Sequence, residues 1–468
     1  MSNTDQGAYR SPFSWRYGSK EMRHIFSEEH KYLLWRKIWV ALARAEYEAR
    51  LLTLKELQDI QKNEANIDIA RILEIEKETK HDVVAAIKEF AEKAVVGGGK
   101  IHLGATSMDV VDNADSIKMK EALLLIDKGV VELLTLFAGL IRIHATHPCM
   151  GYTHLQPAEP TTVGYRLALY AQDLLLVHDQ LSFVLGVIRG KGMKGAVGTS
   201  AGYHALLKDS KMNVQELETM VMKSIGIEPA LIATQVYPRQ YDYLVISTLA
   251  MLSAVLAKFA GDLRLLQSPP IGEWSEPFGK NQVGSSAMPF KKNPIQAENI
   301  CSLARFVSTL PNVLLGNVTY SYLERTLDDS ANKRIVMPEA FLAVDHMLLT
   351  AKGILSGLVI NEKRIAINLN LYSPFSATEA ILMEGTKRGA NRQELHEALR
   401  EVSMKAWGEV QDGRKNRMKE LVVASKYIMG FIPKKEIERL FNVSTHIGNA
   451  PDRALLLVKQ IDKIKPLQ

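Results

Sequence analysis

The sequence predicts an all-α protein of three helical domains, in which long helices form a bundle in the middle domain. Three observations predict this class. Several long segments without proline carry apolar residues at helical spacing. Alternating apolar stretches joined by Asn-Gly or Asp-Gly pairs, which signal hairpins, are nearly absent. The chain has 468 residues, 47% of them hydrophobic, which is enough for more than one core.

Four proline-free segments make up most of the predicted bundle, namely residues 115–147, 163–189, 240–266 and 339–360. Pro238 and Pro338 stand just ahead of the last two segments, where a proline can begin a helix. A fifth segment, 294–320, contains Pro311, which should kink or split a helix at that point.

The first of these segments is apolar around most of its circumference. Its leucines, isoleucines and valines between Leu123 and Phe137 cannot share a single helical stripe. A helix of this kind is buried on several sides, so the segments together predict a long central bundle. The excess of apolar faces further predicts that several copies of the chain pack their bundles together.

The flanks of the bundle differ from it in composition. Residues 1–107 contain shorter, more charged helical segments followed by a glycine-rich loop, Val96–Lys100. Residues 361–468 again predict short amphipathic helices with many Lys and Glu. We therefore expect an N-terminal helical domain (1–107), a central bundle domain (108–360) and a C-terminal helical domain (361–468).

Charge and cysteine usage restrict the class of protein. Lys and Arg number 58 against 52 Asp and Glu, and the net charge of +6 suits anionic metabolites or, by sign alone, nucleic acid. The densest basic run, Arg414–Arg417, has no interleaved aromatics, so we interpret it as a solvated helix face. Two cysteines, a polar segment 1–9 and no apolar run of about 18 residues predict a cytoplasmic protein without a membrane partner.

The most informative segment is a loop at residues 282–294, called the signature loop below. Its sequence GSSAMPFKKNP, residues 284–294, combines two prolines and a glycine, which exclude a helix. Loops of this composition are usually connectors. This one brings together serine hydroxyls, lysines, an asparagine amide and backbone N–H groups, which can bind a carboxylate and the charge that develops on it.

The pattern GSSxMPxKxNP resembles the shared motif of the fumarase, aspartase and argininosuccinate lyase superfamily, whose members eliminate fumarate. Further segments are similar to the adenylosuccinate lyase family in particular. They are Ser14–Tyr17, Lys80–Asp82, Ile101–Ser107, Tyr152–Ala158 and Glu324–Arg334. The resemblance runs from about Tyr9 to about Arg400, with the segments in the expected order.

The resemblance implies a β-elimination that breaks a C–N bond, and it implies catalytic roles for four residues. Ser285 is the implied base, and Lys291 and the loop backbone would stabilise its alkoxide. His154 is the implied general acid, because an imidazole has a pKa near the working pH. Glu298 is similar to the glutamate that orients this histidine in the family.

The resemblance also implies a set of substrate-binding residues. They are Arg16, Tyr17, Lys80, His81, Asp82, His102, Thr106, Ser107, Gln235, Asn293, Asn299, Arg325, Ser330 and Arg334. The implied substrates carry a phosphate and two carboxylates, which arginine binds in bidentate fashion. The chain departs from the family pattern at Lys80, where many relatives have Arg, and at Ser200, where Gln is common. Asn299 stands where animal-type members have Arg, although bacterial members also have Asn there.

The implied activity is release of fumarate from adenylosuccinate, giving AMP, and from the succinylated imidazole carboxamide ribotide (SAICAR), giving AICAR. The family also implies a homotetramer with active sites shared between subunits, and no cofactor. No metal site is expected, because Pro148 interrupts the group His144, His147 and Cys149.

Three alternatives remain open. They are another fumarate-releasing enzyme such as argininosuccinate lyase, a non-catalytic helical scaffold, and a nucleic-acid-binding helical protein. Two further expectations concern loops. Lys191 and Lys194, in the glycine-rich loop 190–198, are interpreted as solvated rather than ligand-binding, and the signature loop is expected to move when no substrate is bound.

Overall fold

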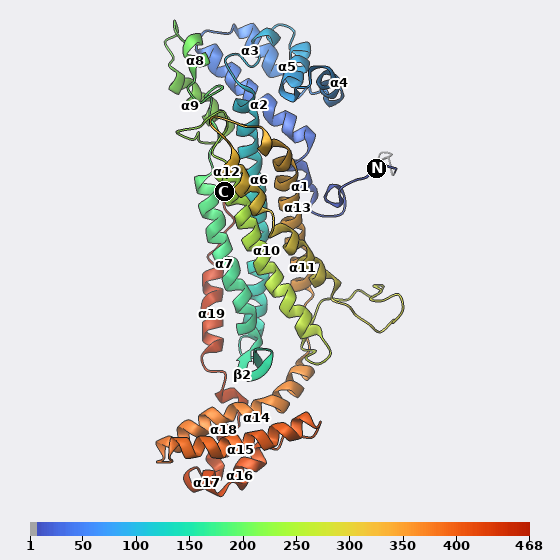
Figure 1. Cartoon of the computed structure of the whole chain (residues 1–468), viewed down its shortest axis with the longest axis vertical. Coiled ribbons are helices and arrows are strands. Elements are labelled where there is room, and N and C mark those ends of the chain that lie inside the picture. The colour runs from blue at the N-terminus through green and yellow to red at the C-terminus, as the bar shows by residue number, and fades with distance from the viewer. Residues whose placement is uncertain (1–6) are drawn as a thin grey trace.

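A bundle of long helices runs along the longest axis of the molecule (Figure 1). The computed structural model describes residues 7–468, so residues 1–6 of the polar N-terminal segment lie outside the described residues. The bundle contains α6 (Ser107–His144), α7 (Val163–Val187), α10 (Gln240–Gln267), α11 (Ile295–Val307) and α13 (Asp328–Ser356). At 1.5 Å per residue, the 38 residues of α6 span about 57 Å. This helix therefore separates its two ends by much more than the length of a nucleotide.

The prolines of the bundle give two confirmed predictions and one that is wrong. Pro238 stands just ahead of α10, which begins at Gln240, as predicted. α11 ends at Val307 and α12 (Pro311–Tyr320) begins at Pro311, so the predicted split is confirmed. Pro338 does not begin a helix but lies inside α13, which starts ten residues earlier at Asp328. The helix continues through Pro338 because its neighbours Met337 and Phe341 are buried in the core, and this packing outweighs the lost backbone hydrogen bond.

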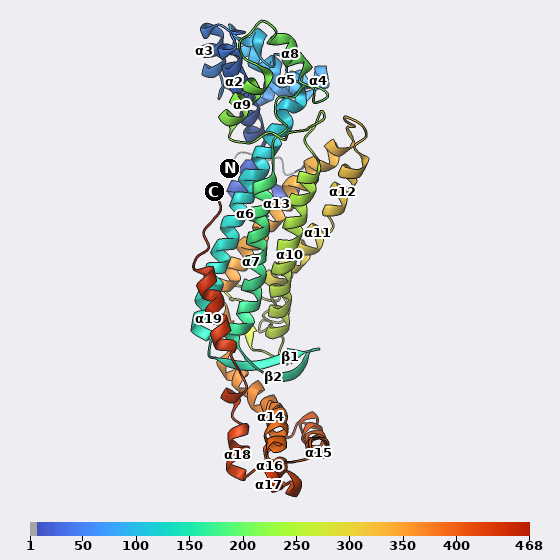
Figure 2. The ribbon, with the colours of Figure 1, turned by 90° about the vertical axis from the view of Figure 1, so that its left-hand side faces the viewer.

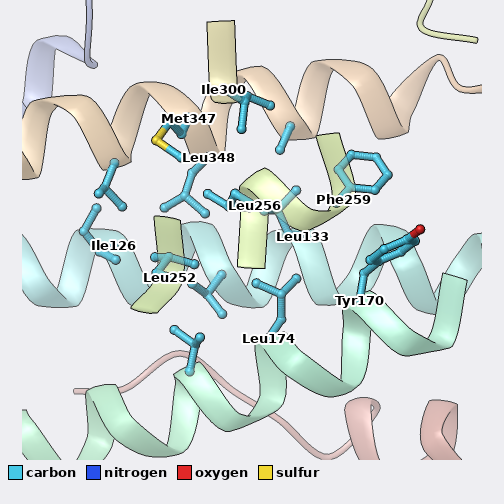
Figure 3. Packing of buried hydrophobic residues seen from close by; sticks show 14 of the residues in the cluster. Ile126, Leu133, Tyr170, Leu174, Leu252, Leu256, Phe259, Ile300, Met347 and Leu348 are labelled. Carbon is cyan, nitrogen blue, oxygen red and sulfur yellow. The ribbon is translucent and has the colours of Figure 1, made fainter. Parts of the chain in front are cut away.

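The bundle core is built from large apolar side chains contributed by α6, α7, α10, α11 and α13 (Figure 3). The ring of Phe259 packs edge-on against Phe137 at 5.5 Å and against Tyr170 at 5.4 Å between centroids. Leu133, Leu252 and related residues of the same cluster pack between the helices of the bundle. Burial of each such side chain contributes roughly 1.5–3 kcal/mol, so this core holds the long helices in fixed positions.

The N-terminal end of the bundle carries a group of shorter helices (Figure 1). They are α1 (Lys20–Ile25), α2 (Glu28–Glu48), α3 (Leu54–Lys62), α4 (Ile69–Thr79) and α5 (Asp82–Lys93), with 3-10 turns at Pro12–Ser14 and Gly98–Lys100. Two helices from the middle of the sequence, α8 (Ala201–Leu206) and α9 (Val214–Ile225), join them by packing on α2. The predicted domain boundaries are not tested by this arrangement and stay a prediction.

A second group of helices lies at the opposite end and has its own apolar core. It contains α14 (Glu362–Lys387), α15 (Arg392–Gln411), α16 (Met418–Ala424), α17 (Lys426–Phe431), α18 (Lys434–Leu440) and a 3-10 turn at Val443–Thr445. The basic run Arg414–Arg417 connects α15 to α16, so its interpretation as a helix face is wrong. Its Asn416 is buried and donates to the carbonyl of Leu371 at 2.7 Å, which holds the segment in an irregular path.

The last helix, α19 (Ala450–Ile461), returns to the bundle and packs along α6 and α7 (Figure 2). The chain beyond it is fastened by the backbone N–H of Leu467, which donates to the Asp127 carboxylate at 2.7 Å. The same carboxylate contacts Nδ1 of His178 at 2.6 Å. The C-terminal segment is therefore part of the bundle structure.

A β-hairpin lies at the end of the bundle farthest from the N-terminal helices (Figure 2). Strand β1 (Pro148–Thr153) pairs antiparallel with β2 (Gln156–Thr162). A separate pair of two-residue strands is formed by β3 (Trp274–Ser275) and β4 (Val359–Ile360), also antiparallel. The sequence analysis missed the hairpin because its prolines and its turn are untypical of strands. The turn consists of His154 and Leu155 rather than Asn-Gly.

One bundle helix, α10, also has the length and apolar composition of a membrane span. In the structure it packs against α7, α11, α12 and α13. Core helices of bundles satisfy the same criteria of length and composition, so this feature carries no further conclusion.

Candidate active site

His154 occupies the tip of the hairpin in a strained backbone conformation. It and Leu155 have φ angles of +53° and +60°, the left-handed region that non-glycine residues rarely adopt. A two-residue turn with both φ values positive matches the right-handed twist of the strands, but costs about 1 kcal/mol for each side chain. In the single chain, His154 is exposed to solvent. The fold therefore maintains a strained turn that presents this side chain at the surface.

The hairpin is anchored on both of its strands. The guanidinium of Arg166 donates to the carbonyl of Met150 on β1 and pairs with Glu273 at 3.1 Å. On β2, the carbonyl of Ala158 accepts from the Ser376 hydroxyl of α14 at 2.9 Å. These contacts fix the strands against α7 and α14, so the turn has a defined position.

The signature loop extends away from the bundle between α10 and α11 (Figure 1). Residues 282–294 contain no helix or strand, which confirms the predicted loop. The hydroxyl oxygen of Ser285 accepts hydrogen bonds from the backbone N–H groups of Met288 at 3.1 Å and Ala287 at 3.3 Å. Two N–H dipoles directed at one oxygen stabilise negative charge on it, which is what an alkoxide base requires.

The base of the loop is closed by close backbone contacts. The Asn293 amide donates to the carbonyl of Gly284 at 2.9 Å. A Cβ on Gly284 would lie 2.1 Å from the carbonyl oxygen of Lys291, so only glycine fits at this crossing. Lys291 itself is exposed. The loop thus holds Ser285, Lys291 and Asn293 on one short closed segment.

Glu298 and Asn299 lie in the first turn of α11, directly after the loop. The Glu298 carboxylate is 3.8 Å from the Arg264 guanidinium, and the Asn299 side-chain oxygen is buried without a hydrogen-bond partner among the described residues. The start of the helix is capped by Glu276, which accepts from the backbone N–H groups of Gln296 at 3.3 Å and Ala297 at 3.1 Å. Glu276 was not identified from the sequence, because a cap twenty residues upstream leaves no local signal.

At the N-terminal end, Lys80, His81 and Asp82 form the sharp connection between α4 and α5. Lys80 ends α4 with a left-handed φ of +54°, and His81 caps α5 by accepting from the Val84 N–H at 3.4 Å. Asp82 begins α5, and its carboxylate pairs with the Arg334 guanidinium at 3.3 Å. The structure thus brings together Asp82 and Arg334, two of the implied substrate-binding residues.

His102 lies beside this connection and is neutral at physiological pH. Its Nδ1 accepts from the indole Nε1 of Trp39 at 3.0 Å, so the ring proton is assigned to Nε2. Burial lowers the pKa of His102 to about 4, against an opposing effect of Asp109. A neutral histidine with an Nε2–H group can donate to a phosphate or carboxylate without carrying charge.

Thr106 and Ser107 form the start of α6, where backbone N–H groups are free of intrahelical partners. Thr106 is the N-cap in a capping box, with its own N–H donating to the Asp109 carboxylate at 3.0 Å. The positive end of a 38-residue helix dipole favours an anion at this position. The two hydroxyls are therefore suitably placed for a substrate phosphate.

The interpretation of Lys191 and Lys194 as solvated loop residues is wrong. Lys191 is 0% exposed and its ammonium donates to the Asp109 carboxylate and to the carbonyl of Gly195. Lys194 pairs with Glu218 at 2.6 Å. A glycine-rich sequence with two lysines is typical of an exposed loop. Here the glycines, which have no side chain, allow the loop backbone to fold inward around the Asp109 carboxylate. Lys191 thereby supports the residue that caps α6.

The remaining predicted residues lie in the segment before α10, in and just before α13, and in the segment before α1. The backbone N–H of Gln235 donates to the carbonyl of Glu324 at 3.2 Å, and Nη1 of Arg325 is buried without a hydrogen-bond partner among residues 7–468. Ser330 lies in the first turn of α13. Tyr17 packs on His346, with ring centroids 4.8 Å apart, and burial, together with the neighbouring Arg16, lowers the pKa of His346.

Helix lengths show that one chain divides the predicted residues into two distant groups. Thr106 and Ser107 lie at the start of α6 and the His154 hairpin follows its end, about 57 Å away. Gln235 precedes α10 and the Ser285 loop follows that helix, whose 28 residues span about 42 Å. The implied catalytic residues and most implied substrate ligands therefore lie in opposite halves of the same chain.

Similarity to known proteins agrees with the motif segments. Residues 16–308 match the family model described as Lyase, and residues 374–454 match the model described as Adenylosuccinate lyase C-terminus. A protein of Schistosoma mansoni named adenylosuccinate lyase is 38% identical over 424 residues, covering 90% of this chain and 88% of the relative. A protein of Schizosaccharomyces pombe with the same name is 38% identical, and the match covers 96% of this chain and 94% of that relative. That of Pyrococcus abyssi is 34% identical and covers 97% and 98%.

Solved structures agree on the fold. A fumarate lyase from Mesorhizobium sp. BNC1 superposes with a TM-score of 0.84 at 21% identity, covering 97% of this chain and 99% of the other. The 3-carboxy-cis,cis-muconate lactonizing enzyme of Pseudomonas putida gives 0.82 at 22% identity, covering 96% and 99%. The all-α fold class is thus confirmed. With two family models matched and relatives above 30% identity along nearly its whole length, this chain belongs to the adenylosuccinate lyase family of carbon–nitrogen lyases.

Proposed function

We propose that the protein cleaves fumarate from adenylosuccinate to give AMP, and from SAICAR to give AICAR. The observation that carries this proposal is the Ser285 hydroxyl, which accepts two backbone N–H groups inside a loop that also carries Lys291 and Asn293. Relatives that are named adenylosuccinate lyase support the choice of substrate over argininosuccinate.

The proposed reaction is a β-elimination in two proton transfers. The Ser285 alkoxide removes a proton from the carbon next to a succinyl carboxylate, and the electron pair is held as an aci-carboxylate. That pair then forms the C–C double bond of fumarate while the C–N bond breaks. His154, protonated, gives its proton to the departing nitrogen. Each positioned acid or base of this kind contributes typically 10²–10⁴-fold to the rate.

The distance between the two groups of predicted residues supports active sites built from several chains. A substrate can contact both groups only when a second chain supplies one of them, because α6 alone spans about 57 Å. We therefore propose a homotetramer whose bundles pack together. A mixture of two inactive variants tests this, one altered at His154 and the other at Ser107. Mixed assemblies should regain part of the activity if each site takes these residues from different chains.

Turnover with three substrates tests the proposed activity. Purified protein should release fumarate from adenylosuccinate and SAICAR, and none from argininosuccinate. His154→Ala and Ser285→Ala should remain assembled but lose turnover. Release from argininosuccinate alone would assign a different lyase activity. A folded tetramer that releases no fumarate from any of the three substrates would favour the non-catalytic scaffold.

We also propose that the enzyme acts in the cytoplasm with small molecules alone and needs no cofactor. The +6 net charge is spread along the chain rather than gathered with aromatics, which argues against nucleic acid. Full activity after dialysis against a chelator, and no salt-dependent shift with DNA or RNA, are the expected results.

A further inference from the structure

A buried cluster of charged side chains, distinct from the implied site residues, lies beneath the first turns of α13. It joins α6, the segment before α10, α10 itself and α13. Its members are Asp112, Asp115, Tyr237, Arg239, Asp242, Asp329 and Lys333. Charges taken out of water are costly unless they are paired, so the cluster requires a specific arrangement of these four elements.

Arg239 links α6 to α13. Its Nε donates to the Asp329 carboxylate at 2.7 Å, and its Nη1 lies 3.2 Å from both oxygens of Asp112. All three side chains are buried. The planar guanidinium can bridge two carboxylates at fixed angles, which the single ammonium of a lysine cannot do.

Lys333 makes the second link. Its ammonium donates to the Tyr237 hydroxyl at 2.6 Å and lies 3.2 Å from Asp115 and 3.4 Å from Asp242. The Tyr237 hydroxyl donates in turn to Asp242 at 2.6 Å. Burial alone would lower the pKa of Lys333, but the surrounding carboxylates outweigh this and raise it, so the charge is kept.

These contacts fix the rotation of α13 about its own axis. Asp329 and Lys333 are four residues apart and share the inward face of the helix. Ser330 and Arg334 each follow by one residue, so they share the adjacent face, and the Arg334 side chain is 71% exposed. Any rotation of these turns would move Ser330 and Arg334 together. The cluster therefore sets where both side chains can meet a ligand.

The same cluster holds the segment that carries Gln235. The backbone N–H of Tyr237 donates to Asp112 at 2.8 Å, two residues beyond Gln235, and Arg239 follows two residues later. The Gln235 backbone is itself bonded to Glu324, just before Arg325. One buried network thus sets the relative positions of two substrate-binding segments that are nearly a hundred residues apart in the sequence.

We propose that Arg239 and Lys333 are positioning residues, which align Gln235, Ser330 and Arg334 for substrate without touching it. This inference rests on the proposed function. A network that serves stability alone would lower the melting temperature when weakened and leave substrate affinity unchanged. A positioning network changes KM and ligand affinity more than kcat, because the catalytic Ser285 and His154 belong to other segments.

A matched pair of variants separates these roles. Arg239→Lys keeps the charge but cannot bridge Asp112 and Asp329. Arg36→Lys makes the same change at the buried Arg36–Glu89 pair between α2 and α5, which lies outside the cluster. Arg239→Lys should raise KM for adenylosuccinate, and the Kd for AMP measured by calorimetry, about tenfold, with kcat changed much less. Arg36→Lys should lose similar thermal stability and keep the wild-type KM and Kd.

A second pair of variants keeps the test decisive if Arg239→Lys does not fold. Lys333→Arg should stay closer to the wild-type KM than Lys333→Met, since it retains a cation beside Asp115 and Asp242. The inference would be overturned if folded variants at both Arg239 and Lys333 kept the wild-type KM and Kd. Absence of turnover in the wild-type protein would instead overturn the proposed function, so the two failures are distinguishable.

Discussion

Asp82 and Arg334 are 252 positions apart in the sequence, and their side chains pair at 3.3 Å between α5 and α13. Exposed pairs of this kind contribute about 0–1 kcal/mol to stability, so this one can open at little cost. A substrate anion that binds Arg334 would replace the carboxylate of Asp82. We therefore expect the pair to hold the guanidinium in place before a ligand binds.

Replacing Arg334 separates its effect on binding from its effect on stability. Arg334→Met should change the free energy of unfolding by less than about 1 kcal/mol, because the ion pair is exposed. It should raise KM for adenylosuccinate by tenfold or more, since a bidentate anion contact is lost. Denaturant titration and steady-state kinetics check the two quantities. A normal KM would remove Arg334 from the substrate-binding residues.

Two adjacent serines allow a direct test of the base. Only the Ser285 oxygen accepts the two backbone N–H groups of Ala287 and Met288. Ser285→Ala should therefore lower kcat by at least about 10²-fold, while Ser286→Ala, as the matched control, should have a smaller effect. Stopped-flow or steady-state absorbance measurements suffice. A larger loss in Ser286→Ala would transfer the role of base to that residue.

The strain of the hairpin turn is measurable at Leu155. This side chain is 70% exposed and has a φ of +60°, where glycine carries no steric cost. Leu155→Gly should stabilise the protein by up to about 1 kcal/mol, and Leu155→Ile, whose branched Cβ is disfavoured there, should destabilise it. Thermal melts of the two variants at equal protein concentration give the comparison. The opposite order would show that Leu155 gains its stability from packing on another chain.

The neutral His102 predicts acid sensitivity. Its pKa is about 4 in the folded chain and near 6.5 when unfolded, so the unfolded state binds an extra proton between these values. Stability should be complete above pH 6.5 and fall towards pH 4, by on the order of 3 kcal/mol in total. His102→Asn keeps an acceptor for Trp39 and tolerates the left-handed φ of +69°. Urea titrations from pH 7 to 4 should show a flatter profile for this variant.

Removal of the buried Lys191 should be costly. Lys191→Met leaves the Asp109 carboxylate buried with backbone and hydroxyl donors only, and loss of one partner of a buried pair costs about 3–5 kcal/mol. Lys208→Met, at an exposed lysine of the same region, should change stability by less than about 0.5 kcal/mol. Equal melting temperatures for both variants would contradict a structural role for Lys191.

The long helices could be predicted from the sequence because their apolar residues repeat over many turns, and one proline, Pro311, marked a real break. Pro338 misled the prediction, since tertiary packing on both sides can carry a helix through a proline. The hairpin was missed because His154 and Leu155 adopt a turn that their residue types disfavour. Such local disagreement is typical of a functional site.

The candidate residues were identified by motif, but their arrangement in space could not be. Nothing local in the sequence indicates that Arg334 meets Asp82 or that Lys191 is buried under Asp109, because both contacts join distant segments. The Arg239 and Lys333 cluster was missed for the same reason. In the sequence, residues that form buried ion pairs cannot be distinguished from ordinary surface charges, because their partners are brought near only by the fold.

The contact between Leu467 and Asp127 spans 340 residues and affects how the protein is made. Ribosomes synthesise chains from the N-terminus at about 5–20 residues per second, so α6 is made tens of seconds before α19 and Leu467, which pack on it. The apolar faces of α6 that pack on α13 and on α19 stay uncovered until each of these helices has been made. We therefore expect a nascent chain to expose this apolar surface of α6 until α19 has been synthesised, and a truncation before α19 to leave it uncovered.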